Sequence, residues 1–189
     1  MARADTALSA LKYQVSKFCT HVNNTYTGGA GDVSTNYVFH IEPFDESDAA
    51  SFSPTLGSSN YSFIITRFTT EATPDYPAGW LRQKYDADIL IVRKTLRTKD
   101  RTNDRNLLQF GGTNDAGGTV TSIERLASDL QKWFRVITQG GKLIDAAATE
   151  HAFKCDILDI GELTKSGDFY FKLCKFTALS MESTTISAT

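Results

Sequence analysis

The spacing of apolar positions predicts two amphipathic helices. The first is expected from about Thr6 to Val22, because its apolar residues recur every three or four positions, at Leu8, Leu11, Val15, Phe18 and Val22. The second lies in "TSIERLASDLQKWFRVIT", with its stripe at Ile123, Leu126, Ala127, Leu130, Trp133, Phe134 and Ile137. Thr121 and Glu124 fit a capping box at its start, and Gly140 and Gly141 fit its end.

Alternating and continuous apolar runs predict five strands. "NYVFHIEPF" alternates apolar and polar positions, and "YSFIITRF" follows it. Residues 82–96 form the third expected strand, whose centre from Ile89 to Val92 is apolar on both faces. "HAFKCDILDIGELTKSGDFYFKLCKFTALSM" predicts two more strands, joined as an antiparallel hairpin by a turn at Lys165, Ser166 and Gly167.

The order of these elements predicts an α+β fold. One helix, three strands, one helix and two strands suit a single domain over residues 1–189, since a chain of 189 residues divides poorly into two cores. We expect one mostly antiparallel sheet, a three-stranded meander plus the C-terminal hairpin, with both helices packed on it. The expected common core is Leu11, Phe18, Ile89, Ile91, Leu126, Leu130, Phe134 and Phe171.

Three polar or glycine-rich stretches are expected to be long loops. They cover residues 43–60, 69–80 and 97–119, and the last contains "FGGTNDAGGT". Loops of this length in a small domain favour a role in contacts with other molecules.

Charge and cysteine content exclude several function classes. Lys and Arg number 20 against 22 for Asp and Glu, so the chain lacks the bulk positive charge of a dedicated nucleic-acid binder. Cys19, Cys155 and Cys174 are widely spaced, which indicates reduced, buried thiols and neither a disulfide framework nor a zinc site. No stretch approaches the length of a membrane span or a signal peptide, so we expect a protein made in the cytoplasm.

No catalytic, metal or cofactor site is expected. His21, His40 and His151 fall in separate elements without ligand or triad spacing, and the glycine pairs match no phosphate-binding loop. The acidic turn of Asp45, Glu46 and Asp48 lacks the spacing of a calcium loop and favours a solvated surface. The sequence therefore predicts no enzyme.

The third strand continues into a run of alternating charge that offers three functional interpretations: a nucleic-acid grip, the approach to an active site, or an arm that reaches another subunit. The run contains Arg97, Lys99, Asp100, Arg101, Asp104 and Arg105. It has no aromatic residue on which a base would stack, so single-strand binding is poorly supported. A solvated loop is the plain interpretation, and an arm that contacts another subunit is the alternative, because mixed charge gives orientation and partner choice.

The order of elements resembles the tail terminator (tail completion) proteins of long-tailed bacteriophages. The likeness runs from "TALSALKYQVSKF" through "YDADILIVRKTL" and "SIERLASDLQKWF" to "CDILDIGELTKSGDFYFKLCKF". It is a likeness of architecture and rests on no single diagnostic motif.

The resemblance implies a structural virion protein at the neck-proximal end of the tail. Such a protein forms a six-fold ring that caps the tail tube, stops its growth and joins the head or neck. The implied partners are other copies of the chain, the tail tube protein, a connector or neck protein, the sheath if the tail contracts, and genomic DNA passing through the lumen. No cofactor and no membrane is implied.

Head-to-tail ring contacts need two different patches on each subunit. The charged run of 97–105 would supply one patch, with Asp45, Glu46 and Asp48 as the guessed acceptor. A head-tail connector is the alternative within the same class. A nucleic-acid-binding module is the alternative from another class, and it would use the basic segment 93–105, with Arg93, Lys94, Arg97, Lys99, Arg101 and Arg105.

Overall fold

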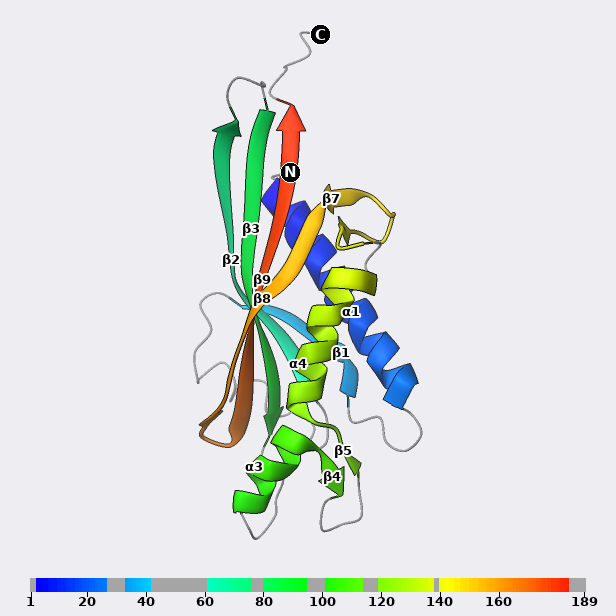
Figure 1. The fold of residues 1–189 in the computed structure, drawn as a ribbon, viewed down its shortest axis with the longest axis vertical. Helices are drawn as coiled ribbons and strands as arrows, with labels where there is room; N and C mark the ends of the chain where they lie inside the picture. The colour runs from blue at the N-terminus through cyan, green and yellow to red at the C-terminus, as the bar shows by residue number, and fades with distance from the viewer. Residues whose placement is uncertain are drawn as a thin grey trace.

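The computed structural model describes residues 3–26, 33–41, 61–75, 80–94, 101–113, 119–137 and 140–183. It has an α+β fold in which a five-stranded sheet carries helices on one face (Figure 1). The predicted fold class is therefore confirmed.

Both predicted helices form, with shifted ends. α1 spans Arg3–Tyr26, and α4 spans Ile123–Lys132 and continues into one π-helical turn, Trp133–Ile137. Ser122, not Thr121, caps α4, since its hydroxyl accepts a hydrogen bond from the Arg125 N–H at 3.2 Å. The Thr121 carbonyl instead accepts a hydrogen bond from the Tyr61 hydroxyl at 2.6 Å.

The five-stranded sheet has the order β1-β2-β3-β9-β8. The strands are β1 Val33–Ile41, β2 Tyr61–Asp75, β3 Trp80–Lys94, β8 Lys154–Ser166 and β9 Phe169–Ser183. The predicted hairpin turn between β8 and β9 is confirmed, with Gly167 at a φ of 52° that suits glycine. Two-residue strands β4 (Gly112–Thr113) and β5 (Thr119–Val120) pair in a small hairpin, as do β6 (Leu143–Ile144) and β7 (Glu150–Ala152).

The first three strands do not form the predicted meander. β1 runs parallel to β2, with Val38 beside Phe63 and Ile41 beside Thr66, whereas the other three pairings of the sheet are antiparallel. The prediction of a mostly antiparallel sheet is confirmed, but the direction of β1 was wrong. An alternating apolar pattern identifies a strand and its two faces, and it carries no information about the direction of the neighbour.

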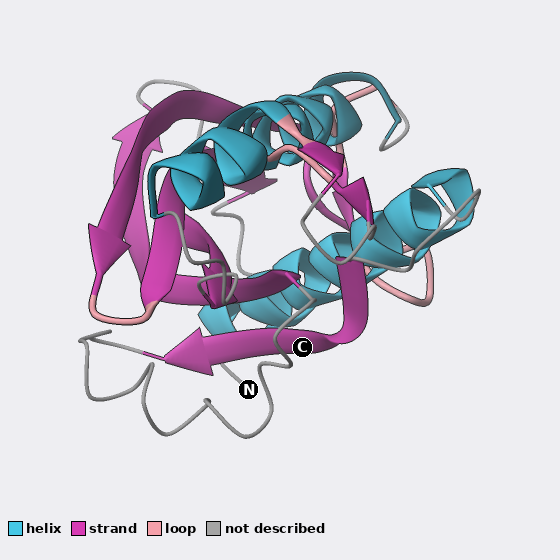
Figure 2. Cartoon of the chain, turned by 90° about the horizontal axis from the view of Figure 1, so that it is seen from below, coloured by secondary structure: helices cyan, strands magenta, loops and turns pink. Residues whose placement is uncertain are grey.

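The core lies between the sheet and the helices. Seven predicted core residues are buried in one cluster, namely Leu11, Phe18, Ile89, Ile91, Leu126, Leu130 and Phe134. Phe171 is the exception: it is only half-buried, because Tyr170 and Cys174 point into the core and Phe171 faces the other side of the sheet. In the view from below, the sheet curves around one side of the helices (Figure 2).

The three predicted loops have different outcomes. Residues 69–80 are mostly not a loop, because β2 continues to Asp75 and β3 begins at Trp80. The segment 97–119 contains a third helix, α3 (Arg101–Phe110), as well as β4 and the start of β5. The segment 43–60 lies outside the described residues. The polar composition of 69–75 misled the prediction, since a strand exposed on both faces needs no apolar alternation.

Leu130 gives a direct test of this packing. Leu130→Ala removes a side chain that is fully buried between α4 and the sheet, so we expect the free energy of unfolding to fall by roughly 2–5 kcal/mol in a denaturant melt. Leu158→Ala is the matched control, because Leu158 is 62% exposed and should change stability by less than about 1 kcal/mol. Equal effects of the two variants would contradict the packing of α4.

Candidate assembly surfaces

The described part of the charged run after β3, from Arg101 on, belongs to a helix. Arg97, Lys99 and Asp100 lie outside the described residues, as do Asp45, Glu46 and Asp48, so the structure does not place the two predicted patches together. Arg101 begins α3, and Arg105 is exposed on it. Asp104 is only 3% exposed, which corrects the prediction that it extends into solvent.

α3 is part of the folded body. Leu107 and Leu108 are buried beside Asp104 on one face of the helix, and Phe110 is 72% exposed at its end. The Ser122 hydroxyl donates a hydrogen bond to the Gln109 carbonyl, which joins the end of α3 to the start of α4. The signal for this helix was the apolar set in "NLLQF", which the surrounding charges obscured.

Sequence reasoning also missed a row of alternating aromatic and basic side chains on the core face. Arg93 pairs with Tyr170 across β3 and β9, and Tyr170 pairs with Lys165 across β9 and β8. The Arg93 guanidinium lies 4.8 Å from the centre of the Tyr61 ring, and the Lys165 ammonium lies 5.4 Å from that of Tyr170. The Arg93 side chain is 1% exposed, so little water surrounds its charge. The face of the Tyr61 ring provides a favourable cation–π contact in place of part of that water.

A second buried cation, Lys172, fastens α4 to the sheet. Its ammonium donates hydrogen bonds to Glu124 Oε1 at 2.8 Å and to the Gly161 carbonyl at 2.7 Å. Lys172 is 3% exposed, so this carboxylate in the first turn of α4 compensates a charge that has been taken out of water. A lysine in the apolar alternation "FYFKLCKF" was the sequence signal for such a contact.

β2, β3 and β9 form a ribbon that projects beyond the helices (Figure 1). Within the described chain, β1 pairs with β2 only as far as Thr66, and β8 pairs with β9 only as far as Leu179. Among the described residues, no strand therefore pairs with the outer edges of the ribbon at residues 67–75 of β2 and 180–183 of β9, although β7 lies beside β9. A β-bulge at Arg67, whose φ is 42°, marks the point where β2 leaves β1.

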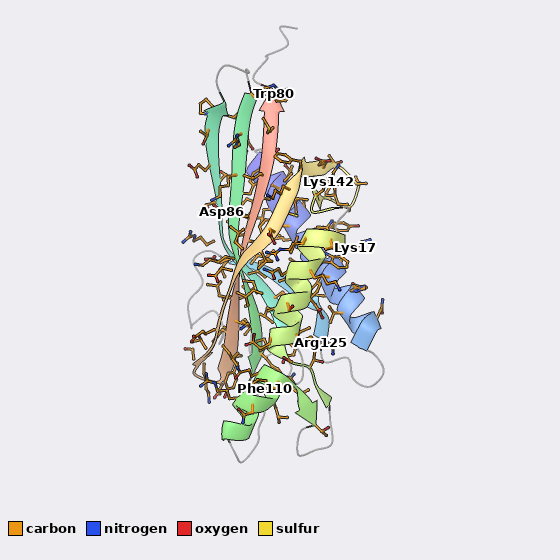
Figure 3. All side chains as sticks on the ribbon, viewed as in Figure 1. Lys17, Trp80, Asp86, Phe110, Arg125 and Lys142 are labelled. Carbon is orange, nitrogen blue, oxygen red and sulfur yellow. The ribbon has the colours of Figure 1, made fainter. Side chains whose placement is uncertain are left out.

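Exposed apolar side chains lie at both ends of the molecule (Figure 3). Trp80 and Met181 are each 42% exposed near the tip of the ribbon, on neighbouring strands, whereas Phe110 is near the opposite end. Aromatic and methionine side chains are enriched at protein interfaces.

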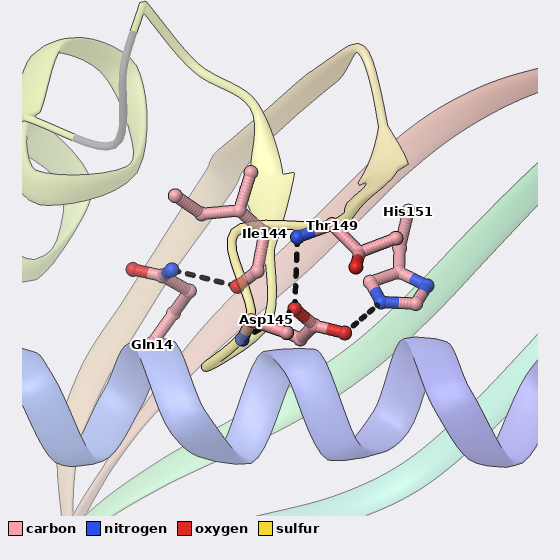
Figure 4. Close-up of polar contacts among 6 residues, drawn as sticks. Gln14, Ile144, Asp145, Thr149 and His151 are labelled. Atoms are coloured by element: carbon pink, nitrogen blue, oxygen red, sulfur yellow. Dashed lines mark hydrogen bonds and ion pairs between the residues drawn. The ribbon is translucent and has the colours of Figure 1, made fainter.

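Asp145 holds the turn between β6 and β7 (Figure 4). Its carboxylate lies 2.9 Å from His151 Nε2 and accepts hydrogen bonds at 2.9 Å from the N–H groups of Ala147 and Thr149. The hydrogen bond from His151, followed by those from the Thr149 and Ala147 backbone, lowers the pKa of Asp145 below 3.8. Gln14 of α1 donates a hydrogen bond to the Ile144 carbonyl at 2.7 Å and so ties this turn to α1.

The three cysteines are free and buried, as predicted. Burial raises the pKa of Cys19 and of Cys174 to about 12, so both thiols are protonated at neutral pH.

Among the side chains that the structure describes, no group of three or more His, Cys, Asp or Glu residues could hold a metal ion. No described helix is long and apolar enough to cross a membrane.

Comparison with known proteins assigns no family. No family model matches the chain, and no curated protein sequence matches it significantly.

The contact between Lys172 and Glu124 predicts an unequal response to loss of either partner. Glu124→Ala leaves a buried ammonium with only the Gly161 carbonyl, so we expect a loss of roughly 3 kcal/mol in the free energy of unfolding. Lys172→Met should cost clearly less, because the Glu124 side chain is 40% exposed and can be hydrated. Denaturant melts measure both values, and the reverse order would contradict a compensating role for Glu124.

Asp145 predicts an acid-dependent contribution to stability. Because its pKa is lowered in the folded protein, the carboxylate stabilises the fold fully above the ordinary aspartate pKa, and this stability is lost as the pH falls through the lowered value. Asp145→Asn should therefore lower the melting temperature at neutral pH, and the difference from the wild type should shrink in acid. A difference that stays constant down to the most acidic pH would show that the charge contributes nothing.

Proposed function

We propose that the protein is a structural subunit of a phage tail, a tail terminator that forms a ring, with six copies as the favoured number. The observation that carries this proposal is the projecting ribbon, which has a different open edge on each side, β2 on one and β9 on the other.

Two different edges on one subunit suit head-to-tail assembly. Open strand edges carry unpaired N–H and C=O groups that favour pairing with another strand. β2 and β9 are both antiparallel to β3, so they run in the same direction, and the β2 edge of one copy can meet the β9 edge of the next with all copies oriented alike. A heterologous contact of this kind forms a ring when its rotation closes, and closure removes the open edges.

The resemblance to tail terminators supports the specific role in the tail. The order of a leading helix, three strands, an amphipathic helix and a closing hairpin is retained in the fold. The parallel pairing of β1 departs from the expected meander, and α3 adds a helix that the resemblance did not imply. In the proposed role, the ring caps the tail tube and presents a surface to the neck, and DNA passes through its lumen.

A head-tail connector remains the alternative within this class, because a connector would use the same kind of ring. The nucleic-acid-binding alternative loses one of its residues. Arg93 is 1% exposed and lies against Tyr61, so it is not available to a phosphate.

Proline substitutions in β2 test the ring through its edge. Neighbouring backbone N–H groups of a strand point to opposite edges, so one of the two variants Thr69→Pro and Thr70→Pro removes an N–H from the open edge and leaves the ladder with β3 intact. We expect the wild type to form a closed ring by light scattering and electron microscopy, and that variant to keep its fold but lose the ring. A wild type that is monomeric in solution and absent as a ring from intact particles would refute the proposal.

The charged run gives a separate test. On the hypothesis that Arg97, Lys99 and Arg101 form an assembly surface, replacing all three with Glu should leave the melting temperature nearly unchanged, since exposed charges contribute under about 1 kcal/mol per pair. If the run contacts a neighbouring copy, the ring or the joining of tails to heads should fail, because like charges then oppose docking. Particles of normal tail length and infectivity would indicate a solvated segment.

A further inference from the structure

The outer edge of β8 and the unpaired edge of β2 differ in their contacts with the rest of the chain. Along β8, the Ile157 carbonyl accepts a hydrogen bond from Gln131 Nε2 at 2.7 Å, and the Gly161 carbonyl accepts one from Lys172 at 2.7 Å. Along β2, side chains from Thr69 to Pro74 are exposed, and no described strand pairs with residues 67–75. Within the described part of the chain, this β2 edge is therefore open to an extended strand.

The geometry of β2 fits a second copy of the same segment. Two such edges can pair antiparallel about a two-fold axis, as in an isologous dimer. β1 occupies the edge up to Thr66, so position 75 of one copy can lie no further along the other copy than opposite position 67 without a collision with β1. The longest overlap without a collision therefore places position 67 of one copy opposite position 75 of the other. In this full-length register, Thr69 lies opposite Thr73, a pair of threonines that is compatible with cross-strand pairing, and Thr70 lies opposite Ala72.

The same register places Glu71 on the two-fold axis, opposite Glu71 of the other copy. Like charges directly opposite each other on paired strands are destabilising. Within its own copy Glu71 lies opposite Lys84, whose ammonium contacts Asp86 at 2.6 Å; the pKa of Lys84 is raised first by Asp86 and more weakly by Glu71. Glu71 is exposed, so its charge is presented to an approaching strand.

We propose that Glu71 is a gatekeeper that prevents the open β2 edge of one copy from pairing with the β2 edge of a second copy. Charged residues on an edge strand are a known means of preventing such pairing. This role does not rest on the ring: it holds whether or not β9 of another copy binds the same edge. If the ring forms, the gatekeeper keeps the edge available for its head-to-tail neighbour.

Removal of the charge is the first test. Glu71→Thr in the full chain should self-associate a few-fold more tightly than the wild type in sedimentation over a concentration series, measured under conditions in which the wild type has not assembled into a ring and its β2 edge is unoccupied. Glu162→Thr is the matched control, because Glu162 is an exposed glutamate on β8, and it should behave like the wild type. Circular dichroism checks that each variant is folded. Glu71→Thr that associates no more than the wild type would overturn the proposal.

A mixing experiment tests the register. Glu71→Lys alone again places like charges on the axis, so it should not associate further. An equimolar mixture of the wild type and Glu71→Lys should form mixed pairs, because opposite charges then meet across the axis. If Glu71→Thr associates but the mixture does not, position 71 does not lie opposite itself, and the proposal is equally overturned.

Discussion

The mismatch in length between strands determines the shape of this protein. β2, β3 and β9 each have 15 residues and pair with one another over most of that length, whereas β1 has only 9 residues and β8 has 13. The buried core extends from the part of the sheet where all five strands run together as far as Tyr85 of β3 and Ala178 of β9. The remainder of the three long strands becomes the ribbon, so the body and the projecting part share one continuous hydrogen-bonded ladder. The two open edges follow directly from this mismatch.

Buried charges hold the body at the other end of the sheet. Arg93 and Lys172 lie on neighbouring core-facing rows, where a strand surface covered by helices would ordinarily carry apolar residues. Tyr61 links these rows to the α3–α4 junction, since its ring lies under Arg93 and its hydroxyl donates a hydrogen bond to the Thr121 carbonyl. Lys172 reaches Glu124 three residues further along. The start of α4 is thus held in place by directional polar contacts as well as by its apolar stripe. Because Arg93 and Lys172 are engaged in these buried contacts, they are not available to bind a partner at the surface.

The sequence predicted those parts of the fold that depend on periodicity. The stripes of α1 and α4 and the hairpin at Gly167 all follow from local spacing, and the structure contains them. Phe171 was misplaced because "FYFKLCKF" is apolar on both faces, and a shift of one residue then exchanges the faces. The direction of β1 and the contact between Lys172 and Glu124, 48 residues apart, depend on long-range pairing that local patterns do not encode. The candidate surface was predicted least well: the charged run contains part of a helix, and most of the β2 edge of the ribbon lay within a segment expected to be a loop.

The composition of the ribbon itself favours a role in assembly. Residues 69–74 of its β2 strand, "TTEATP", are mostly polar and are exposed, so this part of the ribbon buries little apolar surface within one copy. Isolated strands without a covered apolar face are marginal in water, and here the third strand and the continuous ladder into the body supply the support. A small domain gains nothing in its own stability from extending three strands beyond its helices. Such an extension is useful if another protein chain contacts it. A second protein surface would cover the exposed side chains of Trp80 and Met181 near its tip and the unpaired strand edges.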